Sequence, residues 1–214
     1  MRRLTVSTIS GLVASLVLVA CASDGRDMTP PREGQSESII SAVDTAALSG
    51  DTEAPHDDDE MTLYGPWLDG DPIPIAHTCG GIGSTPALSW VGVPPETVTL
   101  ALVVLDTTDT SVDAVGRAHW IAYNIDPIVT SIEVDQLPAG ALVGANGFGA
   151  VEAPELAWRA PCPPAGDSRT YVFEVHALDQ QIELPPETPA GDMIRAIDFA
   201  TLGTASLTGT VFGI

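Results

Sequence analysis

The sequence predicts a mostly β fold: one antiparallel β-sheet domain with one or two short helices. Composition is the first indication, because 44% hydrophobic but only 5% aromatic residues, with 20 glycines and 18 prolines, are typical of a globular domain with many turns. The second is a series of short apolar segments separated by turn residues. The third is that strands and helices do not alternate as a doubly wound fold requires. Residues 61–214 suffice for one domain of ordinary size.

Three segments carry the strongest strand pattern. Thr97–Leu105 is a nearly unbroken apolar run, typical of a strand buried on both faces. His119–Ile125 and Tyr171–Leu178 are the next candidates. Because side chains alternate along a strand, Glu174 and His176 should face away from the apolar positions of the third segment.

The C-terminal part of the domain is expected to contain the helix and a last strand. Apolar residues at roughly helical spacing predict a helix over Gly191–Leu202. A final strand is predicted over Leu207–Phe212, with Leu207 and Val211 on one face.

Charge and motif content exclude several functions. The chain has eight arginines, no lysine and 29 carboxylates, for a formal net charge of -21. A nucleic-acid partner requires a basic face, so DNA and RNA are excluded as main partners. Phosphate-binding and dinucleotide-binding glycine loops are missing, as are the G-x-S-x-G and H-E-x-x-H motifs. We therefore expect no cofactor, no metal and no enzymatic activity.

The N-terminus has the layout of an export signal over residues 1–20. Arg2 and Arg3 precede an apolar stretch that ends at Cys21 and is too short to span a bilayer. Residues 18–21 resemble the bacterial lipobox, which predicts acylation of Cys21 and a membrane-anchored lipoprotein facing the periplasm or the cell exterior. The alternative is ordinary cleavage after the small-residue pattern Ala20-Cys21-Ala22, which would discard Cys21 and release a soluble secreted protein.

Residues 21–60 are expected to form a disordered acidic tether. Between Ala22 and Glu60 there are eleven carboxylates and two arginines, with few large apolar residues to offset chain entropy. The acid run at 57–60 lacks the spacing of a calcium loop. A self-repelling spacer is therefore favoured over a metal site.

Polar residues at the strand ends suggest an anion site. Asp106 follows the first strand and His119 begins the next, so antiparallel pairing would bring them to one end of the sheet. A carboxylate beside an imidazole would fix its tautomer and favour the protonated form. Arg169 enters the third strand, and Arg117 and Arg159 lie in the same two segments. The alternatives are a turn-capping aspartate, a satisfied buried histidine and surface ion pairs.

Several ordered motifs are similar to one known family. The motifs are Leu68-Asp69-Gly70 with Ile73-Pro74, CGGIGSTPALSW at 79–90, the segment 106–124, GANGFG at 144–149 and APCPPAGDSRTYVFEVHALD at 160–179. Together they resemble the phosphatidylethanolamine-binding protein family, in its bacterial Raf-kinase-inhibitor-like (YbhB/YbcL) branch. The resemblance covers nearly the whole of 61–214 and implies the β fold of that family.

The resemblance also implies a small anion-binding pocket. Asp106 and His119 match positions that line this pocket, and Pro161, Pro163 and Pro164 match its rigid wall. Carried over in this way, these residues and Arg169 are the expected ligand-binding set.

Departures from the family pattern affect this pocket. Asp106 is followed by Thr107–Thr110 instead of Pro-Asp-Ala-Pro, and the loop is two residues longer. Arg169 occupies the place of a histidine and Ala160 that of a glycine. Near the C-terminus, 199–200 and 211 also differ. Because guanidinium does not titrate in the working range, Arg169 should make the pocket more permanently cationic.

Cys79 and Cys162 lie in two of the motif turns. A pair of cysteines in an exported protein invites a disulfide, and the resemblance places both turns near the pocket rim. Two free thiols, or a zinc site completed by His77, are the alternatives left open.

The function implied is that of a non-enzymatic, lipid-anchored binding protein. It would recognise a small anionic or phosphorylated ligand, or dock a protein through the same pocket rim. Alternatives are a kinase or protease inhibitor, a ligand-free envelope interaction module, and a weak hydrolase. The hydrolase would need Ser84 or Thr85 as nucleophile, although these hydroxyls are better explained as turn residues.

Overall fold

The computed structural model describes residues 60–109 and 117–214. The predicted export signal (1–20), the predicted lipidation site Cys21 and the tether up to residue 59 lie outside the described residues. Thr110, in the variant loop, also lies outside them.

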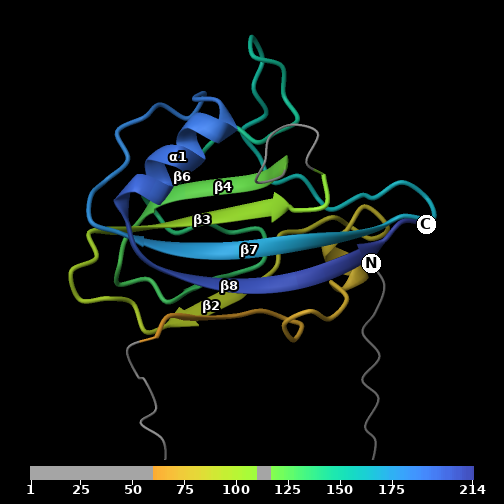
Figure 1. The fold of residues 1–214 in the computed structure, drawn as a ribbon, viewed down its shortest axis with the longest axis horizontal. Helices are drawn as coiled ribbons and strands as arrows, with labels where there is room; N and C mark the ends of the chain where they lie inside the picture. Colours follow the sequence, from red (N-terminus) through yellow and green to blue (C-terminus); the bar gives the residue numbers. More distant parts are fainter. Residues whose placement is uncertain (1–59, 110–116) are drawn as a thin grey trace, which may run out of the picture. The chain divides into compact units, whose positions relative to one another are not determined.

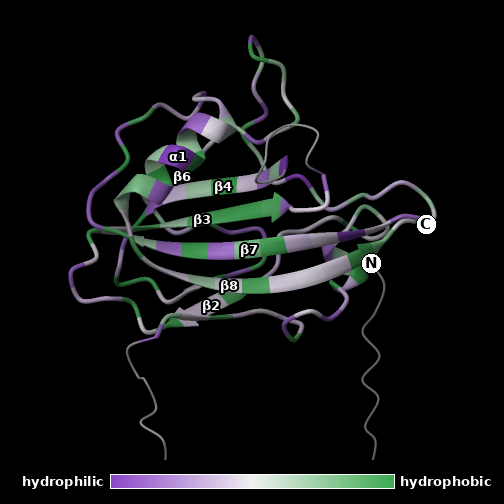
Figure 2. Ribbon diagram, viewed as in Figure 1, coloured by the Kyte–Doolittle hydropathy of each residue, from purple (hydrophilic) through white to green (hydrophobic). Residues whose placement is uncertain are grey.

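A five-stranded antiparallel sheet forms the larger layer of the domain (Figure 1). In spatial order its strands are β6 (Leu142–Val143), β4 (Arg117–Ile125), β3 (Thr99–Asp106), β7 (Ser168–Leu178) and β8 (Thr201–Phe212). The central strand β3 is buried at every residue, as its apolar run predicted, and it is coloured hydrophobic in Figure 2. It begins two residues later than predicted, because Thr97 closes a turn onto the Pro94 carbonyl.

A three-stranded antiparallel sheet covers one face of the larger sheet. It is formed by β1 (Thr62–Tyr64), β2 (Leu88–Val91) and β5 (Ser131–Ile132), in the order β1-β2-β5. Side chains of both sheets form one buried cluster, the inter-sheet core, which includes Trp90 and Phe173. These strands are too short to have produced a clear sequence pattern.

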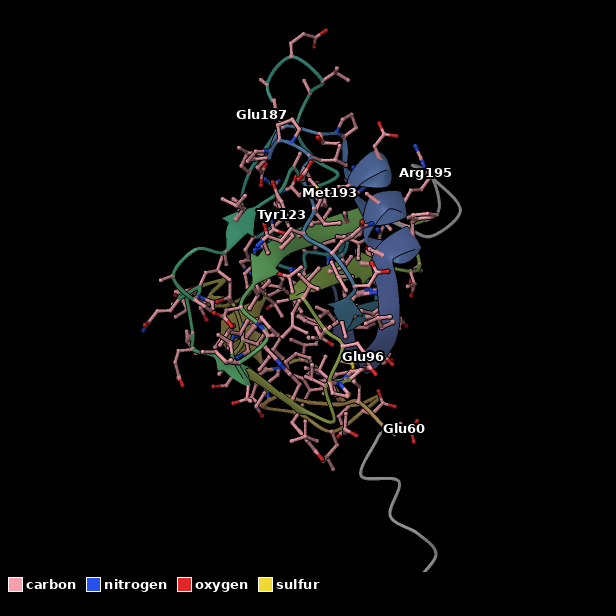
Figure 3. All side chains as sticks on the ribbon, turned by 90° about the vertical axis from the view of Figure 1, so that its left-hand side faces the viewer. Glu60, Glu96, Tyr123, Glu187, Met193 and Arg195 are labelled. Atoms are coloured by element: carbon pink, nitrogen blue, oxygen red, sulfur yellow. A yellow bond between two sulfur atoms is a disulfide. The ribbon has the colours of Figure 1, made fainter. Side chains whose placement is uncertain are left out.

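Helix α1 (Ala190–Ala200) covers the opposite face of the larger sheet (Figure 1). Met193 and Ile197 are fully buried against Val103 and Ile121. Figure 3 shows Met193 on the sheet side of α1 and Arg195 on the solvent side, as expected of an amphipathic helix. A short 3-10 helix, η1, spans Ile75–His77.

The predicted boundaries in the C-terminal part were wrong. The helix ends at Ala200 instead of Leu202, because Thr201 already has an extended backbone with φ -73° and ψ 124°. Strand β8 therefore starts six residues before the predicted Leu207. It pairs along the full length of β7, from Ser168↔Phe212 to Leu178↔Thr201, and these cross-strand bonds override the local pattern.

No helix in the described ranges is long and apolar enough to cross a bilayer.

The predicted alternation of side chains along β7 is confirmed. Tyr171 and Phe173 enter the inter-sheet core. Glu174 and His176 lie on the other face, where Oε2 of Glu174 is 3.5 Å from Nε2 of His176.

Candidate functional site

Three strands of the larger sheet place polar residues side by side at one end. Asp106 is the last residue of β3 and pairs with Arg117 on β4 and Tyr171 on β7. Directly opposed residues in antiparallel strands have neighbouring side chains on the same face. The end of β3 and the start of β4 therefore lie side by side, as the sequence predicts.

A β-bulge brings His119 to this group. Val104 pairs with Trp120, but Leu105 pairs with Ala118, so His119 is the extra residue on β4. A bulge re-aims side chains and interrupts alternation. Trp120 thus packs in the inter-sheet core and Ala118 against the α1 layer, while the His119 ring lies edge-on to Tyr171, with centroids 5.1 Å apart.

The carboxylate of Asp106 is buried and accepts hydrogen bonds from its own loop and from Arg169. The side chain is 2% exposed. Oδ1 accepts the backbone N–H groups of Thr108 and Asp109, both at 3.0 Å, as in a turn-capping aspartate. Oδ2 accepts Nη1 of Arg169 at 2.9 Å. Asp106 consequently both closes its own loop and anchors Arg169.

Arg169 belongs to a chain of ion pairs. Its Nη1 is also 3.4 Å from Oδ2 of Asp109, and that oxygen accepts Nε of Arg117 at 2.9 Å. Hydrogen bonding to Asp106 raises the pKa of Arg169 further above its usual range. Arg169 therefore stays charged over the working pH range, as expected, but the guanidinium charges of Arg169 and Arg117 are paired with the carboxylates of Asp106 and Asp109. Only the remaining N–H groups of Arg169 point to a ligand role.

The tautomer of His119 is set by a backbone carbonyl. Nδ1 lies 2.7 Å from the Arg159 oxygen, which can only accept, so Nδ1 carries the proton. Burial lowers the pKa of His119, and the Arg159 carbonyl and the Asp106 charge only partly oppose this effect. The prediction that Asp106 would fix the tautomer was therefore wrong. The Asp106 charge does favour the protonated ring, as predicted, but burial outweighs it, so at neutral pH the ring is uncharged and Nε2 is an acceptor.

Phe148 also packs against the imidazole of His119, in a T-shaped arrangement. Its ring centroid is 4.8 Å from that of His119, at an interplanar angle of 77°. The guanidinium carbons of Arg117 and Arg159 lie 4.9 and 5.1 Å from the Phe148 centroid, within the range of cation–π attraction. A Cβ on neighbouring Gly147 would lie 2.9 Å from Arg117 Cγ, so only glycine lets this loop approach β4.

Sequence reasoning missed Tyr171 and Phe148 as site residues. Tyr171 is two positions from Arg169 on one strand, so strand alternation could have placed it on the same face. Its pKa is raised by burial first and by the Asp106 charge second. The position of Phe148 depends on a loop and carried no comparable signal.

The three prolines predicted to form the pocket wall differ in solvent exposure. Pro161 and Pro163 are buried, whereas Pro164 is exposed. Pro161 and Pro163 line an apolar cavity of about 220 Å³, which also includes the last residues of the chain. The lining of this cavity does not include Asp106, His119 or Arg169.

A disulfide joins Cys79 and Cys162 beside this cavity. Their Cα atoms are 5.3 Å apart, and the Cys79 N–H donates to the Pro161 carbonyl at 3.0 Å. Bonded sulfurs cannot act as thiolate ligands, so the zinc and free-thiol alternatives do not apply to this state. Among the described residues, no group of three or more His, Cys, Asp or Glu side chains could hold a metal ion.

Ser84 and Thr85, the candidate nucleophiles of the hydrolase alternative, form hydrogen bonds with neighbouring segments of the fold. Ser84 Oγ donates to the Ala76 carbonyl at 3.3 Å and lies 3.1 Å from Nδ1 of His77. Thr85 exchanges hydrogen bonds with Asp135. Neither hydroxyl is paired with His119, so the arrangement does not support a hydrolase in which His119 activates Ser84 or Thr85.

Comparisons with known proteins agree with the fold. The family model described as phosphatidylethanolamine-binding protein matches residues 66–212. A UPF0098 protein of Methanothermobacter thermautotrophicus is 37% identical over 139 residues, covering 64% of this chain and 88% of its own. The Mycobacterium tuberculosis protein named "Putative lipoprotein LppC" is 32% identical over 210 residues, covering 95% and 94%.

Two solved structures resemble the domain. A phosphatidylethanolamine-binding protein homologue from Chlamydia trachomatis has a TM-score of 0.64 at 31% identity, covering 73% of this chain and 99% of its own. Escherichia coli YbcL has a TM-score of 0.64 at 26% identity, covering 72% and 99%. The chain belongs to the phosphatidylethanolamine-binding protein family, in its YbcL-like bacterial branch.

Proposed function

We propose that this chain is an exported, lipid-anchored, non-enzymatic binding protein that takes a small phosphate-like anion at Asp106, His119 and Arg169. The observation that carries the proposal is the convergence of an acid, an imidazole and guanidinium groups from β3, β4 and β7 at one end of the sheet. Family membership supports a binding role. The anchor is supported by Cys21 and by the name of the mycobacterial relative, whose similarity covers 95% of this chain.

An anion can be held here although Arg169 is already paired. Both carboxylate contacts of Arg169 with the described residues use Nη1, and a guanidinium has five N–H donors. Nε and Nη2 can therefore donate to a ligand in the planar geometry that suits phosphate. The side chain is 25% exposed, so such a ligand can reach it from solvent.

The test is calorimetry of the full-length chain in detergent with inorganic phosphate. Arg169→Gln keeps an amide donor for Asp106 but removes the charge, and it should weaken phosphate binding at least about tenfold. Arg195→Gln is the matched control, because Arg195 is exposed on α1 and pairs with Asp192. It should bind phosphate as the wild type does.

Thermal unfolding provides a second measurement on the same samples. Phosphate at about 100 times its dissociation constant should stabilise the wild type by about 2.7 kcal/mol. Unchanged affinity in Arg169→Gln would remove Arg169 from the site. A wild type that neither binds phosphate nor is stabilised by it would favour the ligand-free interaction module instead.

A further inference from the structure

The Cys79–Cys162 disulfide lies at the surface of the domain. Both cysteines are exposed, although the bond joins segments 83 positions apart. A thiolate can attack only a sulfur that it can reach, and exposed disulfides have higher reduction potentials than buried structural ones. Disulfides of this exposed kind are the ones that exchange readily and take regulatory or catalytic roles. The bond is therefore open to reaction with a thiol while the domain stays folded.

An apolar surface adjoins this bond. Both cysteines line the apolar cavity of about 220 Å³ beside Pro161. The same lining contains large side chains that the fold leaves uncovered: Ile75 is 64% exposed, Phe212 65% and Ile214 85%. Exposed large apolar side chains around a hollow are typical of a binding surface. A reactive bond and a surface that can hold an apolar group thus lie next to each other.

The charge of the protein decides which thiols suit this surface. Among the described residues that line the cavity, none has a charged side chain, whereas the whole chain has a formal net charge of -21. The protein as a whole repels anionic thiols such as glutathione, and the lining has no cationic side chain to hold them. A thiol that carries apolar groups gains instead by burying them in the cavity. A cysteine flanked by apolar residues in a polypeptide meets both conditions.

We propose that the Cys79–Cys162 disulfide is a thiol-exchange site for cysteine-bearing apolar peptide segments, which the adjacent cavity holds. This activity goes beyond the proposed anion binding, because Asp106, His119 and Arg169 are not part of the cavity lining.

The exchange step balances without a further reactant. The peptide thiolate attacks Sγ of Cys79 or Cys162, the S–S bond breaks, and a mixed disulfide forms. The other cysteine leaves as a thiolate and takes a proton from water. A second thiol of the same peptide can then attack the mixed disulfide, which releases an oxidised peptide and leaves two thiols on the domain. The disulfide of the protein is itself the oxidant.

The first experiment compares thiols of different polarity on the full-length chain in detergent at pH 7.5. The probes are N-acetyl-Leu-Cys-Leu-amide, N-acetyl-Ser-Cys-Ser-amide and glutathione, compared at equal thiolate concentration. We expect the apolar peptide to exchange at least about tenfold faster than either of the others, because it buries leucine side chains in the cavity. Mass spectrometry of proteolytic fragments assigns the mixed disulfide to Cys79 or Cys162 and separates it from any reaction at Cys21. Equal rates for the three thiols would overturn the proposal.

Two matched variants test the role of the cavity. Phe212→Ser removes an exposed apolar side chain from the lining and should reduce the preference for the apolar peptide to within about threefold. Phe199→Ser is the control, because Phe199 is 87% exposed on α1 and is not part of the lining. It should exchange as the wild type does. Both side chains are exposed, so neither substitution removes core packing. An unchanged preference in Phe212→Ser would overturn the proposal, as would an equal loss in both variants.

A final measurement separates exchange in the folded state from exchange through unfolding. The rate with the apolar peptide should be nearly the same in 0 and 1 M urea, since the bond is already accessible. A reaction that requires global unfolding would accelerate at least about fivefold over this range, because urea raises the unfolded population by that factor. Such an acceleration would show a protected structural disulfide and overturn the proposal.

Discussion

Arg169 and Asp106 depend on each other because one of them is buried. The Asp106 side chain is 2% exposed and the Arg169 side chain 25% exposed, and Nη1 and Oδ2 are 2.9 Å apart. Removing one partner of a buried pair leaves an uncompensated charge and typically costs about 3 to 5 kcal/mol. Arg169→Gln removes the charge as alanine would, but it keeps an amide that can donate to Asp106, and for that reason it is preferred over alanine when binding is measured.

His119 should also make the domain sensitive to acid. A histidine in the unfolded chain has a pKa of about 6.5, and burial lowers the pKa of His119 in the folded state. Below about pH 6.5 the unfolded chain binds this proton more readily, so the free energy of unfolding falls, by at most about 1.4 kcal/mol per pH unit, until the folded pKa is reached.

Urea unfolding of the wild type and His119→Gln between pH 8 and pH 5 measures this contribution. The variant cannot take up the proton, so its stability should decline less steeply below pH 6.5. Parallel curves for the two proteins over the whole range would show that His119 titrates alike in both states, and that its burial has no consequence for protonation.

The sequence predicted part of this residue-level picture. It placed Asp106 and His119 at adjoining strand ends, and it singled out Arg169. It did not predict that Arg159 contributes its carbonyl to the imidazole, because that contact joins residues 40 positions apart and depends on loop geometry. The same reason explains why Phe148 was missed.

At the scale of secondary-structure elements, regular pairing brings Asp106, Arg117 and Tyr171 together, and a β-bulge adds His119. The bulge at His119 allows three consecutive residues of β4, Ala118 to Trp120, to serve the α1 layer, the site and the inter-sheet core. The segment around Pro161 is held by its bond to Cys79 and by the disulfide at Cys162. The Cys79–Pro161 hydrogen bond and the disulfide join segments that are far apart in the sequence, so the local sequence pattern does not predict these contacts.

The disulfide should contribute measurably to stability. It closes a loop across 83 positions, for which the chain-entropy model gives at most about 4.5 kcal/mol. The double variant Cys79→Ser/Cys162→Ser should therefore unfold at lower urea concentration by an amount up to this limit. Reductant should shift the wild type in the same direction and leave the double variant unchanged. A wild type unaffected by complete reduction would contradict the prediction.

At the scale of the whole molecule, composition and patterning separate the chain into regions with different tasks. Residues 61–214 supply the apolar faces that build two core layers on either side of the larger sheet. Residues 21–60 are rich in carboxylates and poor in large apolar residues. A charged tether would keep the binding domain away from an anionic membrane surface.

The anchor prediction concerns Cys21. The wild type should fractionate with membranes and carry an acylated cysteine at its mature N-terminus, since more than one acyl chain is needed for stable anchoring. Cys21→Ser should lose the acyl mass. Mass spectrometry of the membrane fraction checks both points, with Cys79→Ser as the control that keeps the modification. A mature wild-type chain that begins after Cys21 would show ordinary cleavage instead.

The sequence by itself determined the fold class, the buried central strand and the family, and it predicted that Asp106 and His119 lie at one end of the sheet. These follow from local properties: hydrophobic periodicity, turn residues and ordered motifs, all of which are written in neighbouring residues. Tertiary structure alone decided which nitrogen of His119 carries the proton, how Arg169 is neutralised, and that β8 extends back to Thr201. Each of these depends on atoms that are distant along the chain and become neighbours only after the sheet has paired.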